Sequence, residues 1–95
     1  MFYVTCKDMD EAEHIACELI SSKLIKCANI FPITSVHCWR GETVKDNEVV
    51  LILKAREKDR NKIVKAVKKM HSYDVPCILS WDVKANKKFS EWINE

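Results

Sequence analysis

The strongest pattern in this sequence is a run of five apolar residues that begins at Val49. Side chains alternate along a strand, so Val49, Leu51 and Leu53 share one face. Val50 and Ile52 share the other face. Fully burying one such side chain gains roughly 1.5–3 kcal/mol, while a whole domain is stable by only about 5–15 kcal/mol. A strand that is apolar on both faces, in a chain with helices for only one face, therefore predicts an oligomer. The pattern does not decide which face meets the helices.

Hydrophobic periods elsewhere in the chain predict the remaining elements. The predicted strands span residues 2–6, 27–39, 48–55 and 77–83. The predicted helices span residues 9–24, a segment around residues 63–70, and residues 89–93. The order strand–helix–strand–strand–helix–strand is that of the ferredoxin-like fold, an antiparallel four-stranded sheet with both long helices on one face. We therefore predict an α+β protein with a single domain over residues 1–95 and a short C-terminal helix.

Local signals set the expected boundaries of these elements. Asp8 and Asp10 are candidate N-caps, since each is followed three residues later by a glutamate, as in a capping box. Pro32 cannot donate a hydrogen bond to a neighbouring strand, so we expect a bulge or a sheet edge there. The only glycine, within residues 40–43, and the polar pair at residues 46–47 predict the turn of a hairpin between the second and third strands.

Composition and charge exclude several classes of function. Apolar residues make up 47% and charged residues 32% of the chain, which is ordinary for a soluble globular domain. The net charge of +2 is too weak to indicate a nucleic-acid binder. No apolar run reaches the length of a membrane segment, and the first residues lack the pattern of a secretory signal. Five cysteines, an odd number without a C-x-x-C pair, predict reduced thiols and a cytoplasmic protein.

The sequence contains no constellation for catalysis, so we do not expect an enzyme. A single glycine excludes a glycine-rich phosphate loop, and no nucleophile motif is present. His14, His37 and His71 are far apart in the sequence, and we interpret each as structural before catalytic. These patterns require no cofactor.

Large polar and aromatic residues near the strand ends suggest a binding cleft. They are Trp39, Lys54, Tyr73, Trp81 and Trp92. Amphipathic aromatic side chains with a lysine can line a cleft for a small anion. The same residue types also pack between subunits, and that interpretation accounts for them slightly better. The binding hypothesis assigns Trp39, Lys54, Tyr73 and Trp92 to a cleft between subunits.

Several segments, in order and at matching spacing, resemble the CutA family of divalent-cation tolerance proteins. The segments are Thr5–Ala12, Leu24–Pro32, Thr34–Glu42, the strand with Lys54, His71–Pro76 and Phe89–Trp92. The resemblance covers nearly the whole chain and implies a ferredoxin-like protomer that assembles as a homotrimer, with the architecture of the PII signalling proteins. It also implies a role in copper tolerance, with binding of Cu(II) or another divalent cation and no established catalytic activity.

The metal site of the family carries over only in part. It uses a cysteine on the first strand, at a position that corresponds to Val4 here, with Cys6 two residues further along the same strand face. Of two adjacent histidines, Met70 replaces one and His71 keeps the other, while Ser72 replaces the proline that follows. The resemblance therefore implies a metal site formed by His71 and Cys6.

Two other functions follow from the same fold. A PII-like sensor would bind a small anionic ligand in the cleft between subunits. A copper chaperone needs a C-x-x-C loop after the first strand, and Cys6-Lys7-Asp8-Met9 stands there instead, which disfavours that function.

Overall fold

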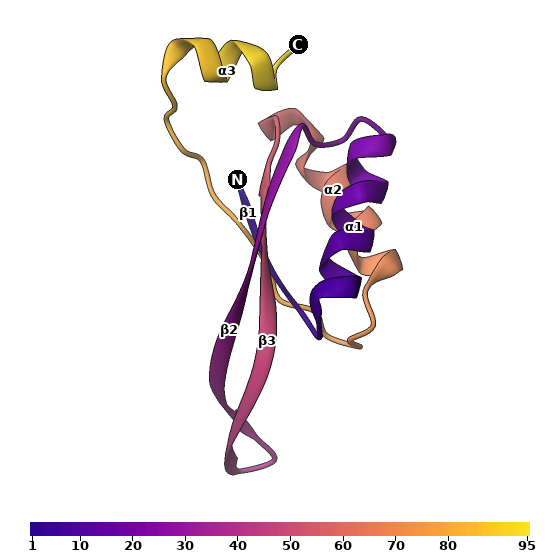
Figure 1. The fold of residues 1–95 in the computed structure, drawn as a ribbon, viewed down its shortest axis with the longest axis vertical. Coiled ribbons are helices and arrows are strands. Elements are labelled where there is room, and N and C mark those ends of the chain that lie inside the picture. The colour runs from indigo at the N-terminus through magenta and orange to yellow at the C-terminus, as the bar shows by residue number, and fades with distance from the viewer.

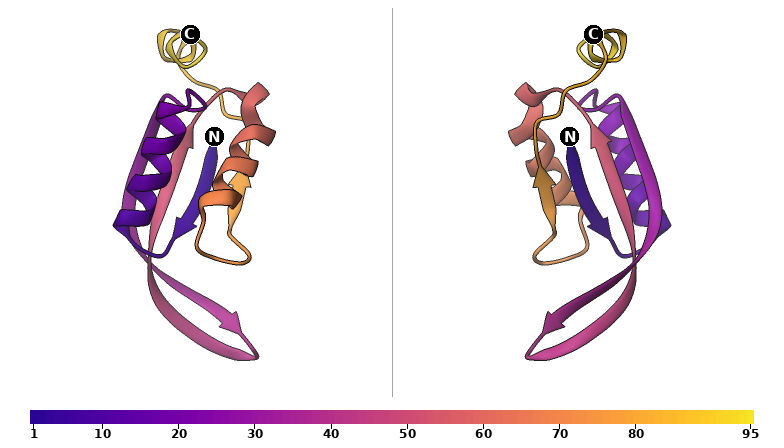
Figure 2. Two further views of the ribbon diagram at one scale, coloured as in Figure 1. Left: turned by 90° about the vertical axis from the view of Figure 1, so that its right-hand side faces the viewer. Right: turned by 90° about the vertical axis from the view of Figure 1, so that its left-hand side faces the viewer.

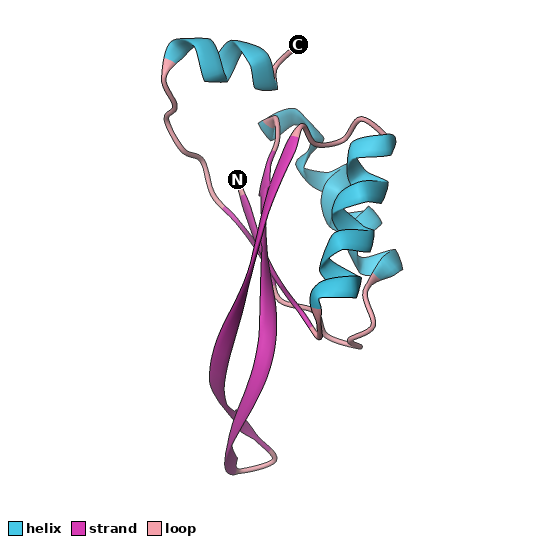
Figure 3. Ribbon diagram, in the orientation of Figure 1, coloured by secondary structure: helices cyan, strands magenta, loops and turns pink.

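Segments rich in β-branched and aromatic residues form the strands of this protein, and amphipathic segments form its helices. A computed structural model describes all of residues 1–95. The strands are β1 (Phe2–Cys6), β2 (Cys27–Trp39), β3 (Glu42–Lys54) and β4 (Ile78–Ser80). The helices are α1 (Met9–Ser21), the 3-10 turn η1 (Glu57–Asp59), α2 (Arg60–Met70) and α3 (Lys87–Ile93). Figures 1 and 3 show α1 and α2 as one layer against the sheet, with α3 apart from both.

All four strands pair in one antiparallel sheet, in the order β2-β3-β1-β4. With α1 and α2 as the connections, this order is that of the ferredoxin-like fold, so the predicted α+β class is confirmed. Strand β2 lies at an edge, and its Pro32 faces Val49 in an unbroken register. The expected sheet edge at Pro32 is therefore present, because an edge strand tolerates a residue that cannot donate to a further strand.

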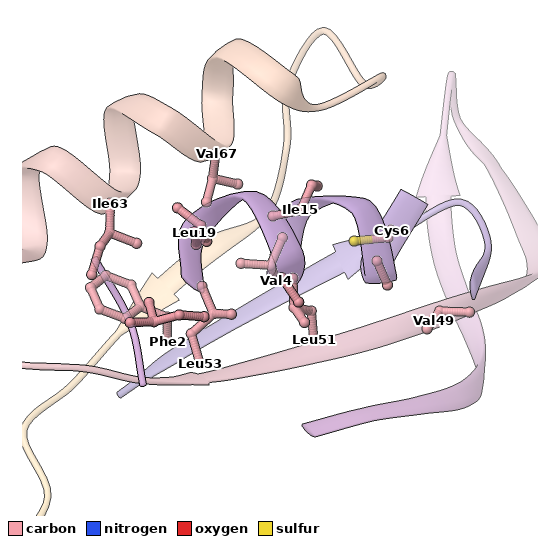
Figure 4. Packing of buried hydrophobic residues seen from close by; sticks show 13 residues of the cluster. Phe2, Val4, Cys6, Ile15, Leu19, Val49, Leu51, Leu53, Ile63 and Val67 are labelled. Atoms are coloured by element: carbon pink, nitrogen blue, oxygen red, sulfur yellow. The ribbon is translucent and has the colours of Figure 1, made fainter. Parts of the chain in front are cut away.

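The face of the sheet under α1 and α2 forms the core, which Figure 4 shows from close by. Val49, Leu51 and Leu53 of β3 point into this core and are buried. From the helices the core takes Ile15, Leu19, Ile63 and Val67, all of which are almost completely buried. The structure thus shows that the face of β3 with Val49, Leu51 and Leu53 is the one that meets the helices.

The opposite face of the sheet has no long helix over it, as the two views of Figure 2 show. Tyr3, Ile52 and Leu79 form one row across this face, and Val50 and Phe31 belong to the next row. Leu79 is 55% exposed and Phe31 is 39% exposed, as expected for apolar side chains without a covering layer. Val50, whose neighbours in the register are Thr5 and Phe31, is buried all the same. The remaining apolar surface is the feature that the run at Val49 predicted.

The hairpin of β2 and β3 is longer than the sequence predicted. Its strands have 13 residues each, and the register runs without a break from Cys27 opposite Lys54 to Trp39 opposite Glu42. The turn consists of Arg40 and Gly41 alone, both with positive φ, as in the tight turns that join twisted strands. The prediction that the third strand begins at residue 48 was therefore wrong. The outer half of the hairpin, which we call the arm, has polar residues on both faces, so its sequence lacks the apolar alternation that predicts a strand. Figure 1 shows this arm projecting beyond the helices.

Three other predicted boundaries also differ from the structure. Helix α1 ends at Ser21 rather than at residue 24, because Ser22 bonds back to the Glu18 and Leu19 carbonyls and Lys23 has positive φ. Strand β4 covers only residues 78–80 of the predicted 77–83, although the Trp81 amide still bonds to the Met1 carbonyl. Helix α3 begins at Lys87, before the predicted residue 89. At the end of α1, short-range hydrogen bonds set a boundary that apolar spacing does not record.

Candidate metal centre

Three potential metal ligands meet where β1 ends, α1 begins and α2 ends. The Sγ atom of Cys6, a carboxylate oxygen of Glu11 and a ring nitrogen of His71 all lie within 4.8 Å of one another. Cys6 is the last residue of β1, Glu11 lies in the first turn of α1, and His71 is the C-cap of α2. We refer to these three residues as the Cys6 cluster. The ferredoxin-like topology brings the three element ends together at one end of the sheet.

Glu11 is fixed by the way in which α1 begins. Asp8 caps the helix, and its Oδ1 accepts a hydrogen bond of 2.8 Å from the Glu11 amide. The Glu11 carboxylate in turn accepts bonds from the backbone amides of Lys7, at 3.0 Å, and Ser72, at 2.9 Å. Burial alone would raise the pKa of Glu11, but the hydrogen bonds from Ser72 and Lys7, with His71 nearby, bring it below its usual value. Glu11 is therefore an anion at neutral pH, and it ties the end of α2 to the start of α1.

The hydrogen bonds of His71 define which of its ring nitrogens carries the proton. The Tyr73 amide donates to Nδ1 at 3.0 Å, so Nδ1 is the unprotonated nitrogen. Nε2 lies 2.7 Å from the Thr5 carbonyl oxygen and donates to it. Both ring nitrogens therefore have backbone partners. A metal ion on His71 has to replace one of these two hydrogen bonds.

Cys6 is buried and keeps its proton at neutral pH. Burial raises the pKa of its thiol to about 12, with further contributions from the carboxylates of Glu11, Asp8 and Glu48. The thiolate is the form that binds metals, so a cation at this cluster has to displace the thiol proton. The carboxylates that disfavour the thiolate are the same charges that favour a cation.

Tyr73 connects the Cys6 cluster to the central strand β3. Its hydroxyl donates to the Glu48 carboxylate at 2.8 Å, and its ring lies 4.8 Å from the ring of His71 between centroids. Burial and the bond to Glu48 raise the pKa of Tyr73, so the phenol stays protonated. The segment after α2 is therefore attached to β1 through His71, to α1 through Ser72 and to β3 through Tyr73.

The structure brings together the two metal ligands that the sequence analysis named, Cys6 and His71. Val4 and Cys6 both belong to the core, and the sulfur that lies next to His71 is that of Cys6. Met70, which replaces the second histidine of the family, packs against this core.

Sequence reasoning missed Glu11 as a member of the site. The capping box that begins at Asp8 was a partial signal, because it places a carboxylate at the third residue of the helix, but Asp10 with Glu13 gives the same pattern.

The four residues assigned to an anion cleft do not meet within one chain. Lys54 lies at the end of β3, with its Nζ 5.6 Å from the centre of the Phe89 ring in α3. Trp92 is close by on α3 and carries the Nζ of Lys26 over its ring at 5.3 Å. Tyr73 belongs instead to the surroundings of His71, and Trp39 lies at the tip of the arm beside Arg40.

Comparisons with known proteins match this chain over nearly all of its residues. The family model described as CutA1 divalent ion tolerance protein matches residues 1–95. A divalent-cation tolerance protein CutA from Archaeoglobus fulgidus is 39% identical over 94 residues, which cover 98% of this chain and 92% of the relative. The chloroplastic protein CutA 1 of Oryza sativa is 39% identical over 93 residues, and this chain spans 52% of its length.

Solved structures give the same result. The structure of the periplasmic divalent cation tolerance protein CutA from Archaeoglobus fulgidus matches with a TM-score of 0.95 at 38% identity, over 98% of this chain and 92% of that chain. CutA1 from Pyrococcus horikoshii matches with a TM-score of 0.94 at 33% identity, with the same coverage of both chains. No helix of this protein is both long and apolar enough to cross a membrane.

Proposed function

This chain belongs to the CutA1 family of divalent ion tolerance proteins, and we propose that it binds a divalent cation, copper in particular, at the Cys6 cluster. The observation that supports this most directly is the meeting of a thiol, an imidazole and a carboxylate within 4.8 Å. Thiolate and imidazole are ligands that suit copper and zinc, and a carboxylate oxygen can complete such a site.

Cation binding at this cluster requires two local changes. The Cys6 thiol loses its proton, and one ring nitrogen of His71 leaves its backbone partner, either the Thr5 carbonyl or the Tyr73 amide. Glu11 is already ionised, so it provides negative charge without further cost. The proposed role is therefore binding with a release of protons, and no catalytic step is assigned to the site.

We propose that the protein acts as a homotrimer in which residues 1–95 form a single domain of each protomer. The uncovered sheet face around Ile52, Leu79 and Phe31 supports this assembly, because a second sheet packed on it would bury these side chains. We also propose a cytoplasmic location, supported by five cysteines that form no disulfide.

A second candidate function is a PII-like sensor of a small anion. The position of Lys54 and Trp92 at the same end of the molecule, next to α3, favours it. This function does not depend on the Cys6 cluster. The two functions can therefore be tested separately.

Isothermal titration calorimetry with Cu(II) and Zn(II) tests the proposed metal site. We expect His71→Ala and Cys6→Ser each to weaken binding by tenfold or more, a loss of about 1.4 kcal/mol, because each removes a direct ligand. The matched control is His37→Ala, since His37 also faces a carboxylate, at 3.7 Å from Asp46, but lies on the projecting arm. Equal affinities for wild type, His71→Ala and Cys6→Ser would exclude the Cys6 cluster as the metal site.

A further inference from the structure

A cavity of about 370 Å³ lies beside α3, and it shares no residue with the Cys6 cluster. It is bounded by α3, by residues 82–85 that lead into α3, and by residues 54–57 at the end of β3. Its volume falls within the range of about 300–1,000 Å³ that is typical of small-molecule sites. The side chains that matter for its chemistry are Lys54, Arg56, Lys84, Val83, Phe89 and Ile93.

Lys54 is a half-buried cation without a counter-ion. Its Nζ lies over the Phe89 ring, 5.6 Å from the centroid, and no carboxylate is paired with it. The ion pairs of the chain are His37 with Asp46 and Arg56 with Asp59. A partly desolvated ammonium is costly unless it has a partner, and an aromatic ring offsets only part of that cost. Lys54 is thus a half-buried cation of this cavity wall that has no anionic partner within the chain.

Arg56 lies next to Lys54 in the cavity wall, but its charge is already compensated. Its Nη2 and Nε both contact Oδ2 of the buried Asp59, at 2.8 Å and 2.9 Å. This pair fixes the position of the guanidinium in the cavity wall. Lys54 and exposed Lys84 supply the remaining side-chain cations of the wall. The Met1 ammonium also lines the cavity, where it donates to the Trp81 carbonyl at 2.9 Å.

Two carboxylates, Glu57 and Asp82, also line the cavity, and both residues are exposed. Water and salt screen exposed charges far more than half-buried ones. The inner part of the cavity therefore favours an anion even though its rim has charges of both signs. Val83, Phe89 and Ile93 add an apolar wall, of which Ile93 is only 8% exposed.

We propose that this cavity binds a small organic anion that consists of a carboxylate on an apolar body. The carboxylate pairs with the Lys54 ammonium, and the apolar body packs against Phe89 and Ile93 of α3. This inference is independent of the proposed metal site. It deepens the second candidate function, on which it rests, by giving a sensor of small anions a location and a class of ligand.

The test uses 3-phenylpropionate as the probe and the neutral 3-phenylpropanol as its matched analogue, titrated into the intact assembly and followed by amide NMR. The acid is expected to shift amides of residues 54–57 and 82–90, and to bind at least tenfold more tightly than the alcohol. Lys54→Gln is expected to remove this preference for the acid, and Lys54→Arg to keep it. Lys62→Gln, on the exposed face of α2, is the control and should bind like wild type.

Four results would overturn the proposal. The first is equal binding of acid and alcohol, and the second is an unchanged preference in Lys54→Gln. The third is a change in oligomer mass in Lys54→Gln, measured by light scattering, since the counter-ion of Lys54 would then belong to a neighbouring copy. If the acid instead shifts amides around Tyr73 or Trp39, the cavity is excluded while an anion sensor with another site survives.

Discussion

At the scale of single residues, His71 determines how the proposed metal site works. Both of its ring nitrogens already have backbone partners, so the imidazole is oriented before any cation arrives. The bond to the Thr5 carbonyl also holds the segment after α2 against β1, and the bond from the Tyr73 amide shapes that segment itself. Cation binding and the position of Tyr73 are therefore coupled, because a metal on either nitrogen competes with one of these bonds.

Glu11 makes the stability of the protein depend on pH in the acidic range. Its pKa in the folded state lies below the ordinary value of 4.5, so its stabilising effect is complete above that pH and is lost as pH falls through the lower folded pKa. We expect Glu11→Gln to reduce the free energy of unfolding by about 1 kcal/mol at pH 7. The difference from wild type should shrink towards pH 3. Urea denaturation at fixed protein concentration measures the difference in free energy of unfolding at both pH values.

The matched control is Glu18→Gln, an exposed residue of α1 whose side chain accepts no hydrogen bond from the protein. It should change stability little at either pH. A difference between wild type and Glu11→Gln that stays constant from pH 7 to pH 3 would contradict the assigned role of the carboxylate.

The resemblance to the CutA family named Cys6 and His71, whereas the residue pattern by itself indicated a reduced buried thiol and a structural histidine. The sequence could not predict Glu11 as their neighbour. Residues 8–18 include five acidic residues, and their spacing does not distinguish the one that turns inward. The distinction comes from Ser72, whose amide reaches Glu11 across 61 positions of sequence.

At the scale of elements, the hairpin shows why boundaries are harder to predict than elements. The apolar inner half of β3 was evident, since burial gives it a pattern. The outer half is solvated on both faces, so residues 42–47 have the composition of a loop, although they pair with β2 throughout. Its register is set by two turn residues with positive φ rather than by packing.

Substitutions in the turn should have opposite effects at its two positions. Gly41 has φ +80° and open space around it, so Gly41→Ala adds backbone strain without a clash. We expect a loss of about 1 kcal/mol in the free energy of unfolding. Arg40 has φ 51° and already bears that strain, so Arg40→Gly should be neutral or slightly stabilising. Urea midpoints of the two variants and wild type test this order, and equal losses at both positions would contradict it.

At the scale of the whole molecule, the uncovered sheet face and the projecting arm are the two features without an explanation inside one chain. The helices account for one face of the sheet and leave Leu79, Phe31 and Trp81 substantially exposed on the other. A trimer that buries this face explains why β3 is apolar on both sides. The proposed oligomer follows from the same five apolar residues that dominate the sequence.

A charge on the uncovered face should therefore break the assembly. Leu79→Glu puts a carboxylate on the apolar surface, and we expect sedimentation velocity to show a shift from trimer to monomer. Ile20→Glu is the control, because Ile20 is 46% exposed on α1, in the helix layer, and should leave the trimer intact. A wild-type protein that sediments as a monomer would exclude the trimer altogether.

The central claim is that a cation binds to the sulfur of Cys6 and to the ring of His71. X-ray absorption at the metal edge, on protein loaded with one equivalent of zinc, tests it most directly. We predict one sulfur neighbour at about 2.3 Å in the wild type, and a shell of only nitrogen and oxygen in Cys6→Ser. A wild-type spectrum without sulfur, identical to that of Cys6→Ser, would contradict the account.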